Sequence, residues 1–342
     1  MQQPNWISEL ADAVEESLRR FFQEKKAEAA TTSPQGNELV GAIERLTMRG
    51  GKRLRPLVLY AGCRAIDPGL PLERVTAAAA GLELLQSYLL IHDDWMDQDD
   101  WRRGGPSVHA DLRTSLSDKH LADSLALLCG DLACAFSWEL LEKAPYPHGR
   151  RLQAMAELAT IHREVIYGQQ LDLIGHPDVS LIHHLKTGTY TVCGPIRLGA
   201  ILADASEAEL GALSRFAEPL GVAFQLRDDL LGIFGNSKRL GKEVGNDLRT
   251  GKNNAVVAEA LKLLRGSELE ALQQLLGNRR ASAREVGTVV ELLRQCGAGE
   301  RIEERIQRMV RQAGEDLKKS AIRPDRTKGL IQLMQLLVVR DR

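Results

Sequence analysis

Two short acidic clusters stand out along the chain, and each follows a long run of mostly apolar residues. The first reads HDDWMDQDD over residues 92–100, and the second reads FQLRDD over residues 224–229. Carboxylates crowded at the C-terminal end of a helix repel one another and oppose the helix dipole. Bound divalent cations relieve both penalties. A solvated acidic helix end explains either cluster alone, but the two together favour metal-binding acids.

The spacing inside the first cluster suits magnesium. Asp93 and Asp97 are four residues apart, which places them on one helix face with Cβ atoms about 6 Å apart. Mg²⁺ uses one or two carboxylates, keeps several waters and takes its other ligands from substrate phosphates. Asp94 lies off this face and is a weaker candidate ligand.

Basic residues near the clusters can hold an anionic substrate. Lys52 lies in the segment GGKRLRP, where a glycine loop enters a helix and three cationic side chains can face an anion. Arg102 and Arg103 follow the first cluster and can clamp diphosphate oxygens, although a surface salt-bridge patch is the alternative. Further lysines, each weak evidence alone, are Lys186, Lys242 and Lys252.

One reaction needs metals, cations and apolar surroundings together, namely ionisation of an allylic diphosphate. Metal ions and cationic side chains stabilise the departing diphosphate. The allylic cation left behind requires a cavity without water, because water would trap it. The sequence therefore predicts that both clusters line one polar pocket in an apolar bundle.

The elements that must position these residues are helices. Apolar residues recur at spacings of three and four, no alternating strand is evident, and aromatic residues make up only 4% of the chain. Pro195 and Pro219 fall inside helical patterns and should kink them. We expect helices at residues 6–28, 38–48, 54–66, 72–100, 118–141, 149–174, 181–202, 207–234, 255–264, 267–276, 281–295, 300–320 and 326–339.

Bulk properties narrow the class of protein. The pattern predicts one all-α domain over residues 1–342, and hydrophobic residues at 44% can fill its core. A formal net charge of −1 gives no global basic field, so we expect no nucleic-acid partner. Five cysteines without a CxxC pair fit reduced thiols. The N-terminus lacks a secretory pattern and apolar runs are short, so we expect a cytoplasmic protein without stable membrane insertion.

In combination, these motifs resemble the trans-isoprenyl diphosphate synthases, the polyprenyl synthetase family. The similar segments run from about residue 40 to residue 255 in the family's order. The resemblance implies an isoprenoid-synthase helical bundle around a central cavity, a homodimer, and a Mg²⁺-dependent condensation of isopentenyl diphosphate with an allylic diphosphate. The departing diphosphate then serves as the base, so no protein base is needed. The motifs that carry the resemblance are residues 50–56, 93–97, 102–104, 186–187 and 224–229.

The resemblance also implies roles for single residues. Three Mg²⁺ ions bound with diphosphate would be held by Asp93, Asp97 and Asp228, supported by Asp94 and Asp229. The isopentenyl diphosphate site would comprise Lys52, Arg55, Gln86 and Arg103. The allylic diphosphate would be held by Arg102, Lys186, Lys242 and Lys252. Side-chain oxygens facing the developing cation, which with Lys186 form the catalytic set, would come from Thr187 and Gln225. The family's GQxxD element matches Gln169 and Asp172.

Two positions depart from the family pattern, and one region bears on product length. Gly232 replaces the last acid of the second motif, and Gln86 stands where many members carry histidine. Tyr88 and Leu89 precede Asp93 by five and four residues, on the helix along which the product should grow. An aromatic residue there, with no insertion in the first motif, resembles geranylgeranyl diphosphate synthases. Farnesyl diphosphate is the alternative product, and an ordinary core tyrosine is the alternative role of Tyr88.

Three other classes remain as alternatives. A terpene cyclase shares the fold and the first motif, but it does not need Lys52 or Lys186 to hold a second diphosphate. A non-catalytic subunit of a heteromeric synthase should have lost acids that this chain keeps. A purely structural helical protein leaves both acidic clusters unexplained.

Overall fold

The computed structural model describes residues 5–235, 245–252 and 254–338, and nearly all of them are helical. The chain packs as two compact units. The first unit comprises Met1–Glu157 with Leu198–Asp204, and the second comprises Leu158–Arg197 with Ala205–Arg342. The boundary passes through two helices, and each unit is described by itself. The all-α fold class is confirmed.

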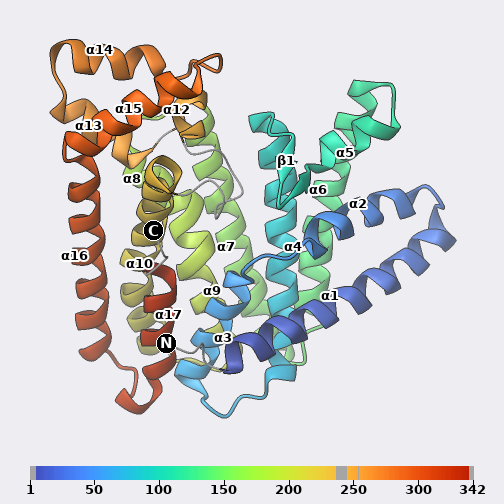
Figure 1. Ribbon diagram of the computed structural model, residues 1–342. Helices are drawn as coiled ribbons and strands as arrows, with labels where there is room; N and C mark the ends of the chain where they lie inside the picture. The colour runs from blue at the N-terminus through green and yellow to red at the C-terminus, as the bar shows by residue number, and fades with distance from the viewer. Residues whose placement is uncertain (1–4, 236–244, 253, 339–342) are drawn as a thin grey trace. The chain divides into compact units, whose positions relative to one another are not determined.

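The first unit is built on two long helices that lie side by side in Figure 1, α4 and α6. They approach closely where side chains are small: a Cβ on Gly81 of α4 would lie 3.0 Å from the carbonyl oxygen of Ser137. Buried alanines such as Ala78, Ala79 and Ala80 line the same helix. The elements are α1 (Asn5–Thr32), α2 (Gly36–Met48), α3 (Leu54–Ile66), α4 (Leu72–Asp97), β1 (Trp101–Arg102), β2 (Gly105–Pro106), α5 (Val108–Ser115), α6 (Lys119–Glu142), and parts of α7 (His148–Leu173) and α9 (Gly194–Leu202).

The chain differs from expectation just after α4. This helix ends at Asp97, three residues earlier than predicted, because Gln98 adopts the left-handed conformation with φ 58°. A two-stranded antiparallel hairpin follows, in which Trp101 pairs with Pro106. Its turn residues Arg103 and Gly104 both have positive φ, as a type I′ turn requires. Two-residue strands are too short to show an alternating pattern, so the sequence did not predict the hairpin.

The second unit is organised around α10, which packs against α16 and against an eleven-residue π-helix, η1. The sequence predicted an ordinary helix where η1 lies. Glycines allow close backbone contact, since a Cβ on Gly221 would lie 2.5 Å from Cα of Gly188. Pro219 lies inside α10, and Pro195 in the first turn of α9, where helices tolerate proline. The elements are the remaining parts of α7 and α9, with α8 (Val179–Ile182), η1 (His183–Cys193), α10 (Glu207–Phe234), α12 (Asn246–Thr250), α13 (Ala255–Leu263), α14 (Gly266–Leu275), α15 (Ala283–Gln295), α16 (Ala298–Lys318), η2 (Pro324–Arg326) and α17 (Lys328–Val338).

One helix of the described part of the chain, α6, is long and apolar enough to cross a membrane by length and composition. Its inner face is buried in the first unit, against α4, α2 and α5, and a core helix passes the same test. Apolar residues also continue onto its outer side. Leu121 and Leu128 are exposed, and Leu125 and Leu132 are half-buried at intervening positions. These residues form one stripe at spacings of four, three and four.

Candidate active site

The first acidic cluster is organised by an arginine from the hairpin. Asp94 is completely buried at the end of α4 and accepts a hydrogen bond from Nε of Arg102 at 2.7 Å, and another from its Nη2. Burial raises the pKa of Asp94 to about 6, against the opposing effect of Arg102. Nη2 of Arg102 also lies 3.6 Å from Asp99 and 4.0 Å from Asp93. Arg102, which we predicted to bind diphosphate oxygens, is therefore paired in this structure with aspartates of the first unit.

Asp93 and Asp97 differ from Asp94 because both remain partly exposed. Their i, i+4 spacing on α4 gives one helix face two hard oxygen donors, which is the donor chemistry that Mg²⁺ prefers. The residues present on this face thus fit magnesium. Asp94 is buried, and its hydrogen bond with Arg102 links the end of α4 to the hairpin.

Of the three basic side chains in and after the loop before α3, one is buried in the protein and cannot face a ligand. Arg53 is only 2% exposed, and its Nη1 donates to the buried Glu83 at 2.6 Å. The expectation that three cationic side chains face an anion is wrong, because Arg53 points into the protein. Lys52 is exposed and Arg55 is half-buried.

The same loop lies next to the hairpin. A Cβ on Gly51 would be 3.5 Å from Nη2 of Arg103, so the Arg103 guanidinium lies over the loop. Nη1 of Arg49 donates to the carbonyl oxygens of Pro106 and Arg102, at 2.5 and 3.4 Å. The first unit therefore brings the Lys52 loop and Arg103 together, as the predicted isopentenyl diphosphate site requires. Gln86, also predicted there, is buried on α4.

The π-helix η1 positions the predicted catalytic residues of the second unit. Nζ of Lys186 donates to Oδ2 of Asp172 on α7 at 2.6 Å. The next residue, Thr187, donates from its hydroxyl to Oε1 of Gln225 on α10 at 2.7 Å. A Cβ on Gly168 would lie 2.5 Å from the backbone nitrogen of Lys186, so a glycine on α7 permits this close approach. These residues come from three helices and form one polar group within the second unit.

Asp229 continues this polar group into the protein. It is 4% exposed, accepts from Nε2 of Gln225 at 2.8 Å and from the backbone N–H of Ala255 at 2.7 Å. Nε2 of His183 also lies 3.3 Å from its Oδ2. Ala255 is the first residue of α13, so the carboxylate also compensates the helix N-terminus. Asp228, by contrast, is partly exposed.

A carboxylate that the sequence analysis missed lies beside Gly232. A Cβ on Gly232 would be 2.5 Å from Oδ2 of Asp247, and Nδ2 of Asn254 donates to the same oxygen at 3.2 Å. Gly232 follows Asp228 by four residues on α10, so both share one face. The absent acid of the second motif thus has a carboxylate from α12 in its place. An aspartate five residues before Lys252, in a segment already noted for its lysines, was the available signal.

Tyr88 lies on α4 at a buried position, and its ring makes an edge-to-face contact with His92 at a centroid distance of 4.9 Å. Burial raises the pKa of Tyr88 to about 12, so the phenol is neutral at pH 7. His92 packs against Gly130 of α6, and its Nε2 is 3.1 Å from the Leu127 carbonyl oxygen. Leu89 is half-buried.

Some predicted relations stay predictions. Lys242 lies outside the described residues, and Lys252 is half-buried with its backbone N–H bonded to the Asp247 carbonyl. The α4 acids belong to the first unit and the α10 acids to the second, so their meeting across one cavity is still a prediction.

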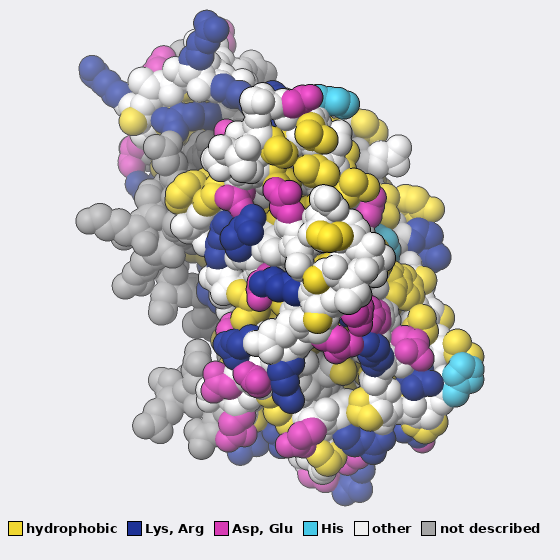
Figure 2. All heavy atoms as spheres, turned by 90° about the vertical axis from the view of Figure 1, so that its right-hand side faces the viewer, with side chains coloured by type: hydrophobic (Ala, Val, Ile, Leu, Met, Phe, Trp, Pro, Cys, Tyr) yellow, Lys and Arg dark blue, Asp and Glu magenta, His cyan; other side chains and the backbone are white. Residues whose placement is uncertain are grey.

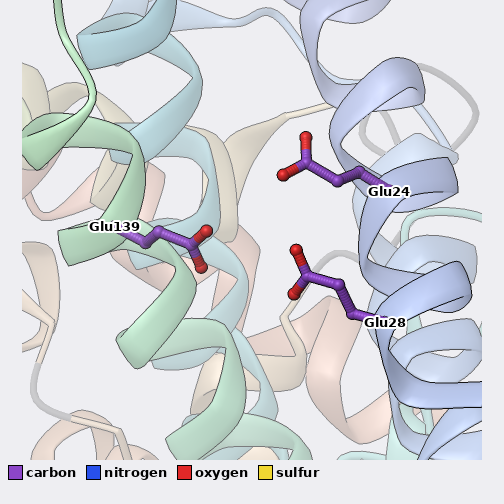
Figure 3. A group of neighbouring side chains, drawn as sticks. All are labelled: Glu24, Glu28 and Glu139. Atoms are coloured by element: carbon purple, nitrogen blue, oxygen red, sulfur yellow. The ribbon is translucent and has the colours of Figure 1, made fainter. Parts of the chain in front are cut away.

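Among the described residues, one group of three acids lies within 4.8 Å, and it is far from either motif in sequence: Glu24, Glu28 and Glu139. Figure 3 shows these side chains on α1 and α6. Nζ of Lys25 lies 2.6 Å from both Glu28 and Glu139, and Nζ of Lys143 bonds Glu24 and Glu139. Two ammonium groups thus already compensate the three carboxylates, and the group is a salt-bridge network between helices. On the face of the molecule shown in Figure 2, acidic and basic side chains are also interspersed.

Comparison with known proteins shows which proteins this chain is similar to. A family model described as polyprenyl synthetase matches residues 37–293. A short chain isoprenyl diphosphate synthase of Methanocaldococcus jannaschii is 32% identical, over 81% of this chain and 82% of that protein. A farnesyl diphosphate synthase of Geobacillus stearothermophilus is 31% identical, over 84% and 96%. A crystal structure of geranylgeranyl pyrophosphate synthase from Corynebacterium glutamicum, complexed with isoprenyl diphosphate and magnesium, superposes with a TM-score of 0.90 at 29% identity, covering 98% and 99% of the two chains.

Proposed function

The chain belongs to the polyprenyl synthetase family, and from that premise we propose that it is a prenyltransferase that makes geranylgeranyl diphosphate. It condenses isopentenyl diphosphate with allylic diphosphates. The observation that carries the proposal is that both aspartate motifs keep a partly exposed first acid toward the C-terminal end of a long helix, Asp93 on α4 and Asp228 on α10. Farnesyl diphosphate is the second candidate product, favoured by the similarity to a farnesyl diphosphate synthase.

Magnesium is the metal that the acids would hold. We propose that Asp93, Asp97 and Asp228 bind three ions together with substrate diphosphate, while the buried Asp94 and Asp229 keep the helix ends in place. Bound magnesium neutralises charge on the leaving diphosphate. Asp247 would add the carboxylate that Gly232 lacks, since its Oδ2 lies on the helix face of Asp228.

Basic side chains divide between the two substrates. The loop residues Lys52 and Arg55, with Gln86 and Arg103, would bind isopentenyl diphosphate, and the closeness of Gly51 to Arg103 supports one shared site. The allylic diphosphate would be bound by Arg102, Lys186, Lys242 and Lys252. Arg102 and Lys186 are paired with Asp94 and Asp172 in the structure, so substrate binding would compete with these acids for the cations.

The reaction begins with ionisation of the allylic diphosphate, followed by attack of the isopentenyl double bond and loss of a proton to diphosphate. Thr187 and Gln225 would face the developing cation. Their mutual hydrogen bond, continued by Gln225 to Asp229, fixes the orientation of both side-chain oxygens before substrate arrives. Such preorganised dipoles stabilise a cation without reorganising during the reaction.

Product length would be limited by Tyr88 and Leu89, one turn before the acids of α4. The Tyr88 ring is held by His92, which is itself packed against α6, so it cannot yield easily to a growing chain. A ring fixed in this way supports a product that stops at geranylgeranyl diphosphate rather than a longer chain.

We also propose that residues 1–342 act as one synthase domain and assemble as a homodimer in the cytoplasm, without inserting in a membrane. The family match spans residues of both units. The apolar stripe on α6 that includes Leu121 and Leu128 offers a surface for a second copy. Sedimentation at micromolar concentration tests the dimer, and Leu128→Glu should shift it to monomer.

The direct test is incubation of the protein with isopentenyl diphosphate, Mg²⁺ and dimethylallyl, geranyl or farnesyl diphosphate, with products sized by chromatography. We expect a twenty-carbon diphosphate from all three starters. A fifteen-carbon end product would favour the farnesyl alternative, cyclic hydrocarbons would indicate a terpene cyclase, and no condensation with any starter would refute the proposal.

A further inference from the structure

The loop before α3 contains a charged residue that the proposed reaction does not use. Arg53 is 2% exposed, although it lies between the exposed Lys52 and the half-buried Arg55. Its Nη1 donates to Glu83 at 2.6 Å, and Glu83 on α4 is also 2% exposed. Burying such a pair costs desolvation free energy that its attraction often fails to repay. The pair is therefore poorly explained as a device for stability alone.

Further contacts fix the Arg53 guanidinium in one orientation. Nη2 donates to the carbonyl oxygen of Thr47, the penultimate residue of α2, at 3.0 Å. Nη2 and Nε also donate to Oε1 of Glu15 on α1, at 3.0 and 3.2 Å. The Thr47 hydroxyl in turn lies 2.7 Å from Oγ of Ser87 on α4. One side chain thus connects α1, α2 and α4 to the loop.

The backbone of Arg53 is also unusual. It adopts the left-handed conformation with φ 44° and ψ 40°, which costs free energy for a residue with a Cβ. Gly50 and Gly51, at φ 85° and 142°, complete a loop that relies on positive φ. Such strain persists only where the surrounding contacts impose it, and it is concentrated at functional sites.

The loop is held from its other end by Arg49. This side chain donates to the Pro106 and Arg102 carbonyl oxygens of the hairpin. The segment from Gly50 to Lys52 therefore lies between two arginines whose guanidinium groups bind protein atoms. Glu83 and Gln86 are three residues apart on α4, so Arg53 bonds the same face of α4 that carries Gln86.

We propose that Arg53 and Glu83 form a positioning pair that sets the strained loop so that Lys52 and Arg55 can bind the diphosphate of isopentenyl diphosphate. This inference rests on the proposed function of the site. Arg53 acts through its neighbours and does not touch substrate. Removing the pair should raise the KM for isopentenyl diphosphate and leave the KM for the allylic substrate close to the wild-type value.

The central test compares Arg53→Met, Glu83→Met and the double variant R53M/E83M. Each single variant leaves one charge buried without its main partner, so both should lower the melting temperature. The double variant removes both charges and should recover stability, because buried pairs are often replaceable by apolar side chains. If the pair positions the loop, the double variant keeps a KM for isopentenyl diphosphate raised about tenfold to 100-fold, since small misplacements have effects of this size.

Two conservative variants decide the matter even if the double variant does not fold. Arg53→Lys keeps the charge but loses the planar fork that reaches three partners, so the same KM should rise. Glu83→Gln keeps an acceptor oxygen for Nη1 and should show a smaller rise. Lys25→Met serves as the matched control, because Lys25 is a buried cation of the same unit, 5% exposed and paired with Glu139 on α6. It should lose stability without changing either KM.

The outcomes separate this inference from the proposed function. If the wild-type protein does not condense the two substrates, the proposed function fails first. If the wild-type protein is active and R53K and the folded double variant have the wild-type KM for isopentenyl diphosphate, the positioning role is overturned. An equal rise in both KM values would also overturn it, because it would indicate a general loss of structure.

Discussion

The C-terminal ends of α4 and α10 share one sequence pattern but are stabilised differently. In both, the first aspartate is partly exposed and the second is buried. Asp94 is matched by an arginine side chain from a hairpin, whereas Asp229 is matched by a backbone N–H at the start of α13 and by the Gln225 amide. The comparison supports the proposal that the partly exposed first acid of each pair binds metal, whereas the buried second acid holds the helix in place. The partner that stabilises the second acid differs between the two units.

The largest effect is expected from the first acids. Asp93→Asn and Asp228→Asn should each lower kcat by about 1,000-fold, because each removes a charged oxygen that binds metal at the leaving group. Both side chains are partly exposed, so melting temperatures should change little. Steady-state condensation assays and thermal melts measure both. The control is Asp325→Asn, an exposed acid on η2, which should leave kcat unchanged. Wild-type turnover in either aspartate variant would break the assignment.

The second acids should affect stability before chemistry. Asp94→Asn removes the nearest charged partner of the Arg102 guanidinium, which keeps only Asp99 at 3.6 Å and Asp93 at 4.0 Å, and should cost about 3 kcal/mol of unfolding free energy. Asp229→Asn sets a new amide N–H₂ among the N–H donors of Gln225 and Ala255 and should cost about 1–3 kcal/mol. Denaturant titration checks the order. A variant that keeps full stability but loses all activity would show that its aspartate is a ligand after all.

A smaller effect, on metal affinity, is expected near the end of α10, where Asp247 lies in place of the missing acid of the second motif. The motif at the end of α4 is complete, so no such replacement is needed there. Gly232→Ala should displace that carboxylate and weaken Mg²⁺ binding about tenfold, as should Asp247→Asn. Manganese binding followed by electron paramagnetic resonance measures this apart from turnover. Gly287→Ala on α15 is the matched control, since its Cβ would meet nothing within 4 Å. The double variant G232D/D247G moves the acid back onto α10 and should restore affinity. Unchanged metal binding in both single variants would exclude Asp247 from the site.

The smallest effect on rate is expected from substitutions one turn before the first acid, and there the length of the product should change instead. Five residues before its first acid, α4 carries Tyr88 and α10 carries Ala223, so at this one position only α4 has a large side chain. Tyr88→Ala should lengthen the product by at least one five-carbon unit while condensation continues. Tyr88→Phe keeps the ring and should leave the length unchanged. Mass spectrometry of the extracted products decides it, and an unaltered distribution in the alanine variant would remove Tyr88 as the limit.

Local regularities were predictable from the sequence, because helix period and capping depend on neighbours in the chain. The helix over residues 207–234 matches α10 at both ends, and its Ser206–Glu209 capping box explains why it begins there. The i, i+4 spacing of Asp93 and Asp97 also required only that α4 be a helix. The π-geometry of η1 was not predictable, since it depends on how Gly168, Gly188 and Gly221 bring three helices together.

The identity of each side chain's partner was decided by tertiary structure alone. Nothing near Arg53 in the sequence indicates that it turns inward to Glu83, thirty residues away, and nothing near Gly232 indicates that Asp247 fills its place. Such pairings depend on which loops the packed helices bring into contact, and on the cost of leaving a buried charge unpaired. Amino-acid type and spacing determined which groups this protein could use, and packing determined which of them bind each other.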